Sequence, residues 1–203
     1  IDYFRSLRDD GVVRLTEDPR PFNFSRINNE AARQAHGECL VFLNNDIDII
    51  TPDWLEELIS HALRPAIGSV GAKLWYPNDK IQHAGLVLVG GLAAHAHHGR
   101  PRGDHGYFDR ASLTQSLSAV TGACLCIRKQ VFDEVGGFDE TLAVAFNDVD
   151  LCLRIQARGY RNLYTPYAEL HHYESASRGG EDTPDKLARF RKEADVLSAR
   201  WKP

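Results

Sequence analysis

The chain of 203 residues carries 24 Lys and Arg against 28 Asp and Glu, which gives a formal net charge of −4. A nucleic-acid binder needs a basic face that displaces phosphate counterions, so this balance argues against that class and favours small molecules or glycans as partners. With 43% hydrophobic residues the chain can bury a core, and its length predicts a single domain over residues 1–203.

The cysteines and the apolar runs indicate the compartment. The four cysteines lie in apolar or helical segments without the spacing of a disulfide framework, so we expect buried free thiols and a reducing environment. No apolar run reaches the roughly 18 residues of a membrane helix, and no signal peptide opens the chain. We therefore expect a cytoplasmic protein without a transmembrane segment, compatible with peripheral association at the inner face of the membrane. The chain lacks methionine and begins with Ile1, which predicts a segment of a longer protein.

The first third of the chain alternates predicted helices and strands. In order, the predicted elements are a helix over 1–11, a strand over 12–15, a helix from an N-cap at Ser25 to His36, a strand over 39–43 and a helix over 52–62 that Thr51 and Pro52 open. This β–α–β order predicts an α/β fold with a mixed, mostly parallel sheet flanked by helices.

The remaining elements follow a predicted hairpin. Its strands span 66–76 and 81–89 around Pro77-Asn78-Asp79, and residues 90–117 read as a long irregular lid or binding loop. The later predictions are a strand over 117–127 interrupted at Thr121-Gly122, helices over 129–135 and 147–157, a strand over 162–165 and a C-terminal amphipathic helix within 181–203.

A short apolar strand, Cys39–Leu43, ends at a turn rich in oxygen-bearing side chains. Asn44, Asp46 and Asp48 follow it at the carboxyl edge of the predicted sheet, where open α/β folds bind ligands. Such side chains suit a hard cation, Mg²⁺ or Mn²⁺, that completes its shell with phosphate oxygens. A solvated turn or a helix N-cap explains the same pattern, and both interpretations stay open.

Two further polar groups suggest chemistry. Asp148 opens a predicted helix, whose dipole favours an ionised carboxylate that can accept a proton, although simple capping explains it too. Asp150 is expected to pair with Arg154, four residues on. His171-His172 could bind a divalent metal, and the following Gly-rich segment with Arg178 could close over a diphosphate; a surface histidine pair is the alternative.

Four histidines in the long loop suggest a zinc cluster: His95, His97, His98 and His105. No cysteine lies near them, and adjacent histidines in a Gly-rich loop rarely all bind one metal, so we do not predict zinc.

Together these segments resemble a known family. NFSRINNEAARQAHGECLVFLNNDIDI, AVTGACLCIRKQVFDEVGGFDE, FNDVDLCLRIQARGY and ELHHYESASRG occur in the order seen in family-2 inverting glycosyltransferases with the GT-A fold, especially bacterial rhamnosyl-type and cell-surface polysaccharide enzymes. The resemblance covers about residues 12–180. The opening strands that carry part of the nucleotide site in that family have no match, so we expect the 203-residue chain alone to bind donor weakly.

The resemblance implies a role for individual residues. They are Asp148 as catalytic base; Asp46, Asp48 and His172 at the metal; Asn29, Asn44, Asp46, Gly122 and Arg178 at the nucleotide-sugar donor; and Asp139 and Asn147 near the acceptor. The implied reaction is metal-dependent, inverting transfer of a sugar from a nucleotide-diphosphate donor to a glycan or lipid-linked acceptor in cell-surface polysaccharide synthesis. A non-catalytic glycan-binding or assembly module that keeps the fold is the alternative.

Overall fold

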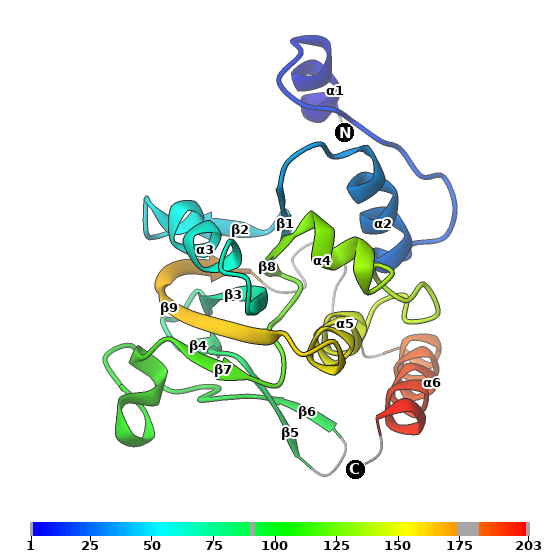
Figure 1. Cartoon of the computed structure of the whole chain (residues 1–203). Helices are drawn as coiled ribbons and strands as arrows, with labels where there is room; N and C mark the ends of the chain where they lie inside the picture. Colours follow the sequence, from blue (N-terminus) through cyan, green and yellow to red (C-terminus); the bar gives the residue numbers. More distant parts are fainter. Residues whose placement is uncertain (1, 90–91, 174–182, 202–203) are drawn as a thin grey trace.

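The computed structural model describes residues 2–89, 92–173 and 183–201. Its strands are β1 (Cys39–Leu43), β2 (Ile47–Ile49), β3 (Ile67–Trp75), β4 (Ile81–His83), β5 (Leu86–Val89), β6 (Leu92–His95), β7 (Gln115–Leu117), β8 (Cys124–Arg128) and β9 (Arg161–His172). The central sheet has the order β1-β8-β3-β9-β2, with β4 on β3 and β7 on β9, while β5 and β6 form a separate two-stranded sheet (Figure 1).

The direction of the strands places the site. β9 pairs with β3 in parallel, and β8 lies antiparallel to both β1 and β3, so β1, β3 and β9 point the same way. Their carboxyl ends therefore share one edge of the sheet. The predicted mixed sheet is confirmed, but its mostly parallel character is wrong. The cause is that β8 returns between two parallel strands, and every other described pair in this sheet is antiparallel.

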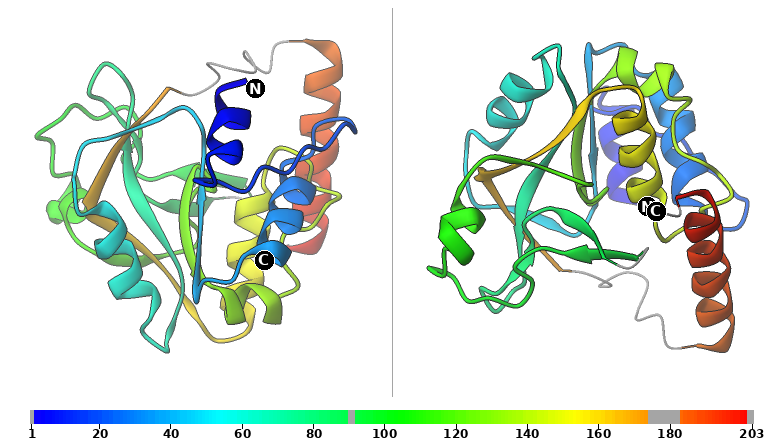
Figure 2. Two further views of the ribbon diagram at one scale, coloured as in Figure 1. Left: turned by 90° about the horizontal axis from the view of Figure 1, so that it is seen from above. Right: turned by 60° about the horizontal axis from the view of Figure 1, so that its bottom comes forward.

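Helices cover both faces of the sheet (Figures 1 and 2). The helices are α1 (Asp2–Asp9), α2 (Phe24–Gln34), α3 (Trp54–Ala62), α4 (Lys129–Glu134), α5 (Asn147–Ala157), α6 (Pro184–Arg200) and the 3₁₀ helix η1 (Tyr107–Ser112). Alternation along β8 separates two apolar layers, because Leu125 and Ile127 pack with α4 and α5 while Cys124 and Cys126 pack with α3. α1 buries no residue and stands apart from the sheet.

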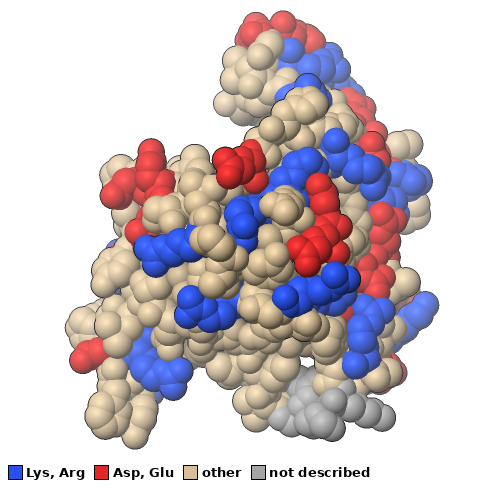
Figure 3. Space-filling view, in the orientation of Figure 1, with Lys and Arg blue, Asp and Glu red and all other residues tan. Residues whose placement is uncertain are grey.

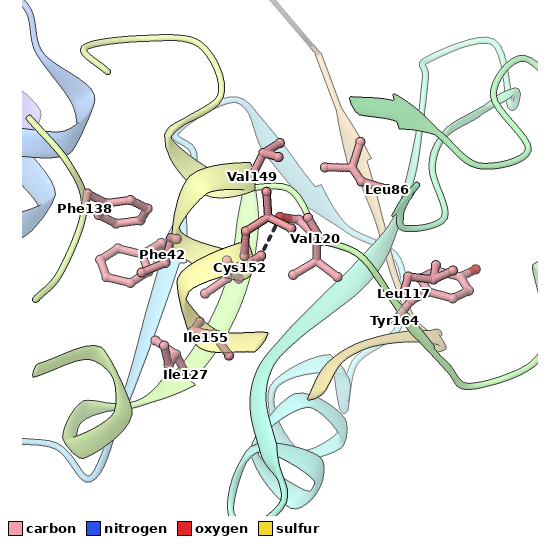
Figure 4. Packing of buried hydrophobic residues seen from close by; sticks show 14 of the residues in the cluster. Phe42, Leu86, Leu117, Val120, Ile127, Phe138, Val149, Cys152, Ile155 and Tyr164 are labelled. Carbon is pink, nitrogen blue, oxygen red and sulfur yellow. Dashed lines mark hydrogen bonds between the residues drawn. The ribbon is translucent and has the colours of Figure 1, made fainter. Parts of the chain in front are cut away.

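The main apolar layer lies between α5 and the sheet. Figure 4 shows Val149, Cys152 and Ile155 of α5 directed toward the strands, with the Cys152 thiol donating to the Val120 carbonyl. Burial raises the pKa of Cys152 to about 12, so this thiol stays protonated. Three of the four cysteines are buried, Cys39 is partly exposed, and all are free, which confirms the predicted thiols.

Several element boundaries differ from the prediction. The predicted strand over 12–15 is irregular and mostly exposed, since it finds no neighbouring strand among the described residues. The N-cap of α2 is Asn23, whose side chain accepts from the Arg26 N–H, and not Ser25. The N-cap position of α3 is Asp53, and not Thr51. The strand over 12–15 is thus a wrong prediction, whereas the two helix corrections concern local ends and the predicted helices themselves are confirmed.

The long loop and the last strand were also predicted too simply. Residues 90–117 include β6, η1 and β7, so this segment is more regular than predicted. β9 continues past Thr165 to His172 because its register slips around Pro166. Gly71 pairs with Tyr164 and Lys73 pairs with Glu169, so an advance of two residues along β3 corresponds to an advance of five along β9. Pro166 therefore lies in a bulge, where its missing N–H costs no ladder bond.

Two surface features bear on partners. On the face drawn in Figure 3, Lys and Arg side chains are interspersed with Asp and Glu, so this face offers no continuous basic surface. Within the described residues, no helix combines the length and apolarity needed to cross a bilayer.

Two neighbouring leucines test the packing. Leu125→Ala should lower the free energy of unfolding by about 2–5 kcal/mol, because Leu125 is 0% exposed and its truncation leaves a cavity. Leu43→Ala, on the adjacent strand, should cost about 0.5 kcal/mol, because Leu43 is 44% exposed. Urea denaturation of the intact protein measures both, and equal losses would contradict the assigned layers.

Candidate functional site

The carboxyl end of β9 meets the turn after β1. His172 Nε2 lies 3.2 Å from Asp46 Oδ1 and 3.2 Å from Asn44 Nδ2. On the other side of the ring, Nδ1 lies 2.7 Å from Gln82 Oε1 of β4. An amide oxygen only accepts, so Nδ1 carries the proton and donates it. Nε2 then presents its lone pair to Asn44 and Asp46.

In this group, the Asp46 carboxylate has an oxygen that lacks a hydrogen-bond donor. Its Oδ1 is buried and receives no hydrogen bond from the described residues, although it lies 3.2 Å from His172 Nε2. A carboxylate oxygen facing an imidazole lone pair needs a cation or a proton between them. An imidazole whose second nitrogen is hydrogen-bonded is the usual form of a metal ligand. Asp46 and His172 therefore fit two positions in the shell of Mg²⁺ or Mn²⁺.

Asp48 lies differently from Asp46. It belongs to β2, where it pairs with His171, and its exposed carboxylate accepts from the Tyr173 hydroxyl at 2.8 Å. In the described part of the chain, no three His, Cys, Asp or Glu side chains are arranged to hold a metal ion. A metal at Asp46 and His172 would thus take its remaining ligands from water and phosphate oxygens, as Mg²⁺ commonly does.

Asp148 lies in the first turn of α5 and is fixed by backbone donors. Oδ2 accepts from Gly122 N at 2.8 Å, and Oδ1 accepts from Val149 N at 2.8 Å. The residue before the helix, Phe146, has φ 61° and ψ 4°, in the left-handed region that side chains other than glycine rarely adopt. Both carboxylate oxygens thus accept a backbone N–H at the N-terminal turn of the helix, which holds the side chain in one orientation.

Asp150, two residues on, serves the core instead. It is 0% exposed and accepts from Arg154 Nε at 2.8 Å, Arg200 Nη1 at 2.7 Å and Trp201 Nε1 at 2.9 Å. The predicted pair with Arg154 is confirmed. The two acidic residues of this turn thus differ, because only Asp148 is partly open to a ligand.

One turn joins the two groups. Asn44 N donates to Ala123 O at 3.0 Å, while the preceding residue, Gly122, donates to Asp148. Thr121 N donates to His83 Nε2 at 3.3 Å, next to Gln82 on β4. Burial above all, and then nearby His95 and His172, hold the pKa of His83 well below its usual value, so its neutral ring can accept this bond. The Asp46–His172 pair and Asp148 therefore lie on either side of the same turn, residues 121–123.

Asn29, predicted at the donor, braces a neighbouring loop. Its Oδ1 accepts from Phe138 N and its Nδ2 donates to Phe138 O, both at 2.9 Å, and Nδ2 also lies 3.1 Å from Glu140 Oε1. Gly137 has φ 70°, and a Cβ there would come within 2.7 Å of Asn29 Oδ1. The contacts of Asn29 within the chain are thus structural.

Of the two predicted acceptor residues, Asp139 lies in the same loop and Asn147 is the first residue of α5. Asp139 accepts from Thr141 and, at 2.7 Å, from Arg200 Nη2. Burial acts to raise the pKa of Asp139, but these hydrogen bonds outweigh it, and the pKa lies below its usual value. Asn147 is buried and donates to Val144 O at 3.0 Å.

The remaining predicted residues are Gly122 and Arg178. Gly122 lies in the turn before β8, not on a strand, and a Cβ there would make ordinary contacts with Phe24 and Asp148 at 3.4–3.5 Å. Packing within the chain therefore does not demand glycine at this position. Arg178 lies outside the described residues.

Sequence reasoning missed Gln82, which orients His172. The available signal was a polar residue in a segment predicted to be a strand over 81–89, where Gln82 of β4 is 4% exposed. Of the four histidines named in the long loop, His95 lies close to a histidine of β4, with the Nδ1 atoms of His83 and His95 3.0 Å apart.

Adjacent asparagines of α2 test the bracing role. Asn29→Ala should lower the free energy of unfolding by about 1–3 kcal/mol, because it leaves the buried Phe138 amide and carbonyl unpaired. Asn28→Ala should cost less, because the bond that Asn28 makes among the described residues goes to a carbonyl of its own helix, Phe24 O. Chemical denaturation of both variants measures this difference, and an Asn29→Ala variant as stable as wild type would contradict it.

Comparison with known sequences gives a consistent family. The family described as "Glycosyltransferase like family 2" matches residues 8–195. The uncharacterized protein y4gI of Sinorhizobium fredii is 54% identical over 100% of this chain and 23% of its own length. The O-antigen biosynthesis protein RfbC of Myxococcus xanthus is 45% identical over 87% of this chain and 14% of its own length. An N-acetylglucosaminyl-diphospho-decaprenol L-rhamnosyltransferase of Mycobacterium tuberculosis is 36% identical over 39% of the chain and 26% of its own length.

The fold matches solved glycosyltransferases as well. GalNAc-T7, whose crystal structure contains UDP, GalNAc and Mn²⁺, superposes with a TM-score of 0.69 at 15% identity, over 96% of this chain and 38% of that chain. The present chain thus has the GT-A fold, and it spans about a quarter or less of the length of the curated relatives it matches.

Proposed function

This chain belongs to the glycosyltransferase-like family 2, and from this membership we propose inverting, metal-dependent sugar transfer from a nucleotide-diphosphate donor to a glycan or lipid-linked acceptor. The carrying observation is that Asp148 and the Asp46–His172 pair flank one turn at the carboxyl edge of the sheet. The name of the O-antigen relative supports a role in cell-surface polysaccharide synthesis. Buried free thiols support a reducing, cytoplasmic location.

Asp148 is proposed as the general base. Its carboxylate is held by the amides of Gly122 and Val149, so it needs no reorganisation before it accepts a proton. An acceptor hydroxyl would attack the anomeric carbon from the face opposite the leaving diphosphate, and Asp148 would take the hydroxyl proton as the new bond forms. Inversion follows from this single displacement.

Asp46 and His172 are proposed to hold the divalent cation. Gln82 fixes the imidazole so that Nε2 faces Asp46, and the bare Oδ1 of Asp46 offers the charge that a cation needs. A bound Mg²⁺ or Mn²⁺ would supply positive charge to the departing diphosphate. The Asn44 amide donates to the same Nε2 atom from the β1 side, and a cation at Nε2 would take the place of this hydrogen bond.

Replacing the proposed base tests catalysis. Asp148→Asn should lower kcat by about 10²–10⁴-fold, because the asparagine amide has the size of the carboxylate but cannot accept the proton. The measurement is release of nucleoside diphosphate from UDP-, GDP- and dTDP-hexoses by the intact protein, with water as acceptor. Asp133→Asn, an exposed carboxylate of α4, is the control and should leave kcat unchanged. An intact protein indifferent to Asp148→Asn would favour the non-catalytic glycan-binding module.

The two acidic residues after β1 test the metal. Asp46→Asn should weaken Mn²⁺ binding, measured by calorimetry, by at least about tenfold, because it removes the buried unpaired charge next to His172. Asp48→Asn should change the affinity less than about threefold, because the Asp48 carboxylate is exposed and bonded to Tyr173. Equal effects would contradict the assignment of Asp46 as the principal ligand.

A further inference from the structure

The loop that leads into the proposed base is held by the C-terminal helix. Glu193 of α6 is charged but only 2% exposed, and its carboxylate faces backbone N–H groups. Oε1 accepts from Ala143 N at 3.0 Å and Val144 N at 3.3 Å, and Oε2 accepts from Ala145 N at 2.7 Å. Three successive amides thus form an anion-binding concavity that a side chain of the same protein fills.

The end of α6 fastens the other side of this loop. Arg200 donates to Asp139 Oδ2 through Nη2 and to Asp150 Oδ1 through Nη1, both at 2.7 Å. Trp201 Nε1 donates to the same Asp150 oxygen at 2.9 Å. The loop over residues 139–146 and the first turn of α5 therefore share one set of charge-assisted bonds with α6, and Figures 1 and 2 show α6 lying beside α5.

The strained residue before the base lies under the same helix. Phe146, with its left-handed backbone, packs against Phe190 of α6 with ring centroids 5.1 Å apart. A conformation of this kind costs free energy and persists where neighbouring contacts enforce it. Phe146 immediately precedes Asn147 and Asp148, so the direction in which α5 presents Asp148 depends on it.

From these contacts we infer that α6 is a positioning helix for the base: Glu193, supported by Arg200, fixes the loop over residues 139–146 and thereby aims the Asp148 carboxylate. This inference rests on the proposed function, because it takes Asp148 as the base. Glu193 and Arg200 touch no reacting atom, and the proposed metal pair lies elsewhere, in the turn between β1 and β2 and at the end of β9. The helix should therefore act on kcat and leave donor binding intact.

A conservative change at Glu193 separates positioning from folding. Glu193→Gln replaces one acceptor oxygen by an NH₂ group that faces amide donors, so the loop should loosen. We expect kcat for nucleoside-diphosphate release from UDP-, GDP- and dTDP-hexoses by the intact protein to fall at least about tenfold, with donor KM within about twofold. Asp195→Asn, the same chemical change on the exposed side of α6, is the matched control and should alter neither.

Hydrogen exchange and a second variant, Arg200→Lys, test the inference independently of the folding of Glu193→Gln. Hydrogen exchange at the amides of residues 143–145 should accelerate in Glu193→Gln and not in Asp195→Asn, whether or not the protein turns over donor. If Glu193→Gln does not fold, Arg200→Lys decides, because lysine cannot span Asp139 and Asp150 together, with Arg191→Lys as its control. Faster exchange with unchanged kcat would overturn the inference while leaving the proposed function in place. Absence of turnover in the wild-type protein would instead overturn the proposed function. Unchanged amide exchange at residues 143–145 in Glu193→Gln would overturn the inference that α6 fixes the loop.

Discussion

The backbone of the turn at residues 121–123 is the link on which the candidate site depends. Its Gly122 N–H fixes Asp148, and its Ala123 carbonyl receives the N–H of Asn44, the first residue of the acidic turn. Both bonds exist because β8 enters the sheet directly after this turn, antiparallel between β1 and β3. Two segments about a hundred residues apart are thereby held against one short piece of backbone, without any direct bond between their side chains.

The state of each carboxylate around this turn indicates its role. Asp150 and Glu193 are buried and each accept three hydrogen bonds from arginine, tryptophan or amide donors, so they contribute order and present no exposed oxygen to a ligand. Asp148 is held by two amides but stays partly exposed, which suits a group that must meet a substrate. Asp46 alone of these four has a buried oxygen without a hydrogen bond from the described residues. The donors around each carboxylate thus differ within one fold, and this difference supports the proposed division into structural, proton-accepting and cation-binding roles.

Sequence patterns predicted the parts of this arrangement that depend on neighbours in the chain. The helix over 147–157 and the strand Cys39–Leu43 follow from local periodicity, and the turn over 77–79 follows from its residues. The insertion of β8 between β1 and β3 could not be predicted, because strand order depends on contacts between distant segments. The same limit hid the bonds of Glu193 to Ala143–Ala145, which are about fifty residues away in the chain. A buried glutamate in an amphipathic helix gives no sign of which amides it will meet.

The two halves of the site are held by different kinds of interaction, and this difference has a functional consequence. Asp46, His172 and Gln82 lie on or beside strands of the sheet, whose ladder bonds resist local movement. Asp148 instead follows a loop whose shape depends on side chains of α2 and α6, such as Ser25, which donates to Leu142 O. Side-chain contacts are more easily rearranged than a ladder, so movement in this molecule should concentrate on the proposed base and on the loop over residues 139–146. The order of the loop before Asp148 would then be set by how firmly α6 docks, while Asp46, His172 and Gln82 stay fixed by the sheet.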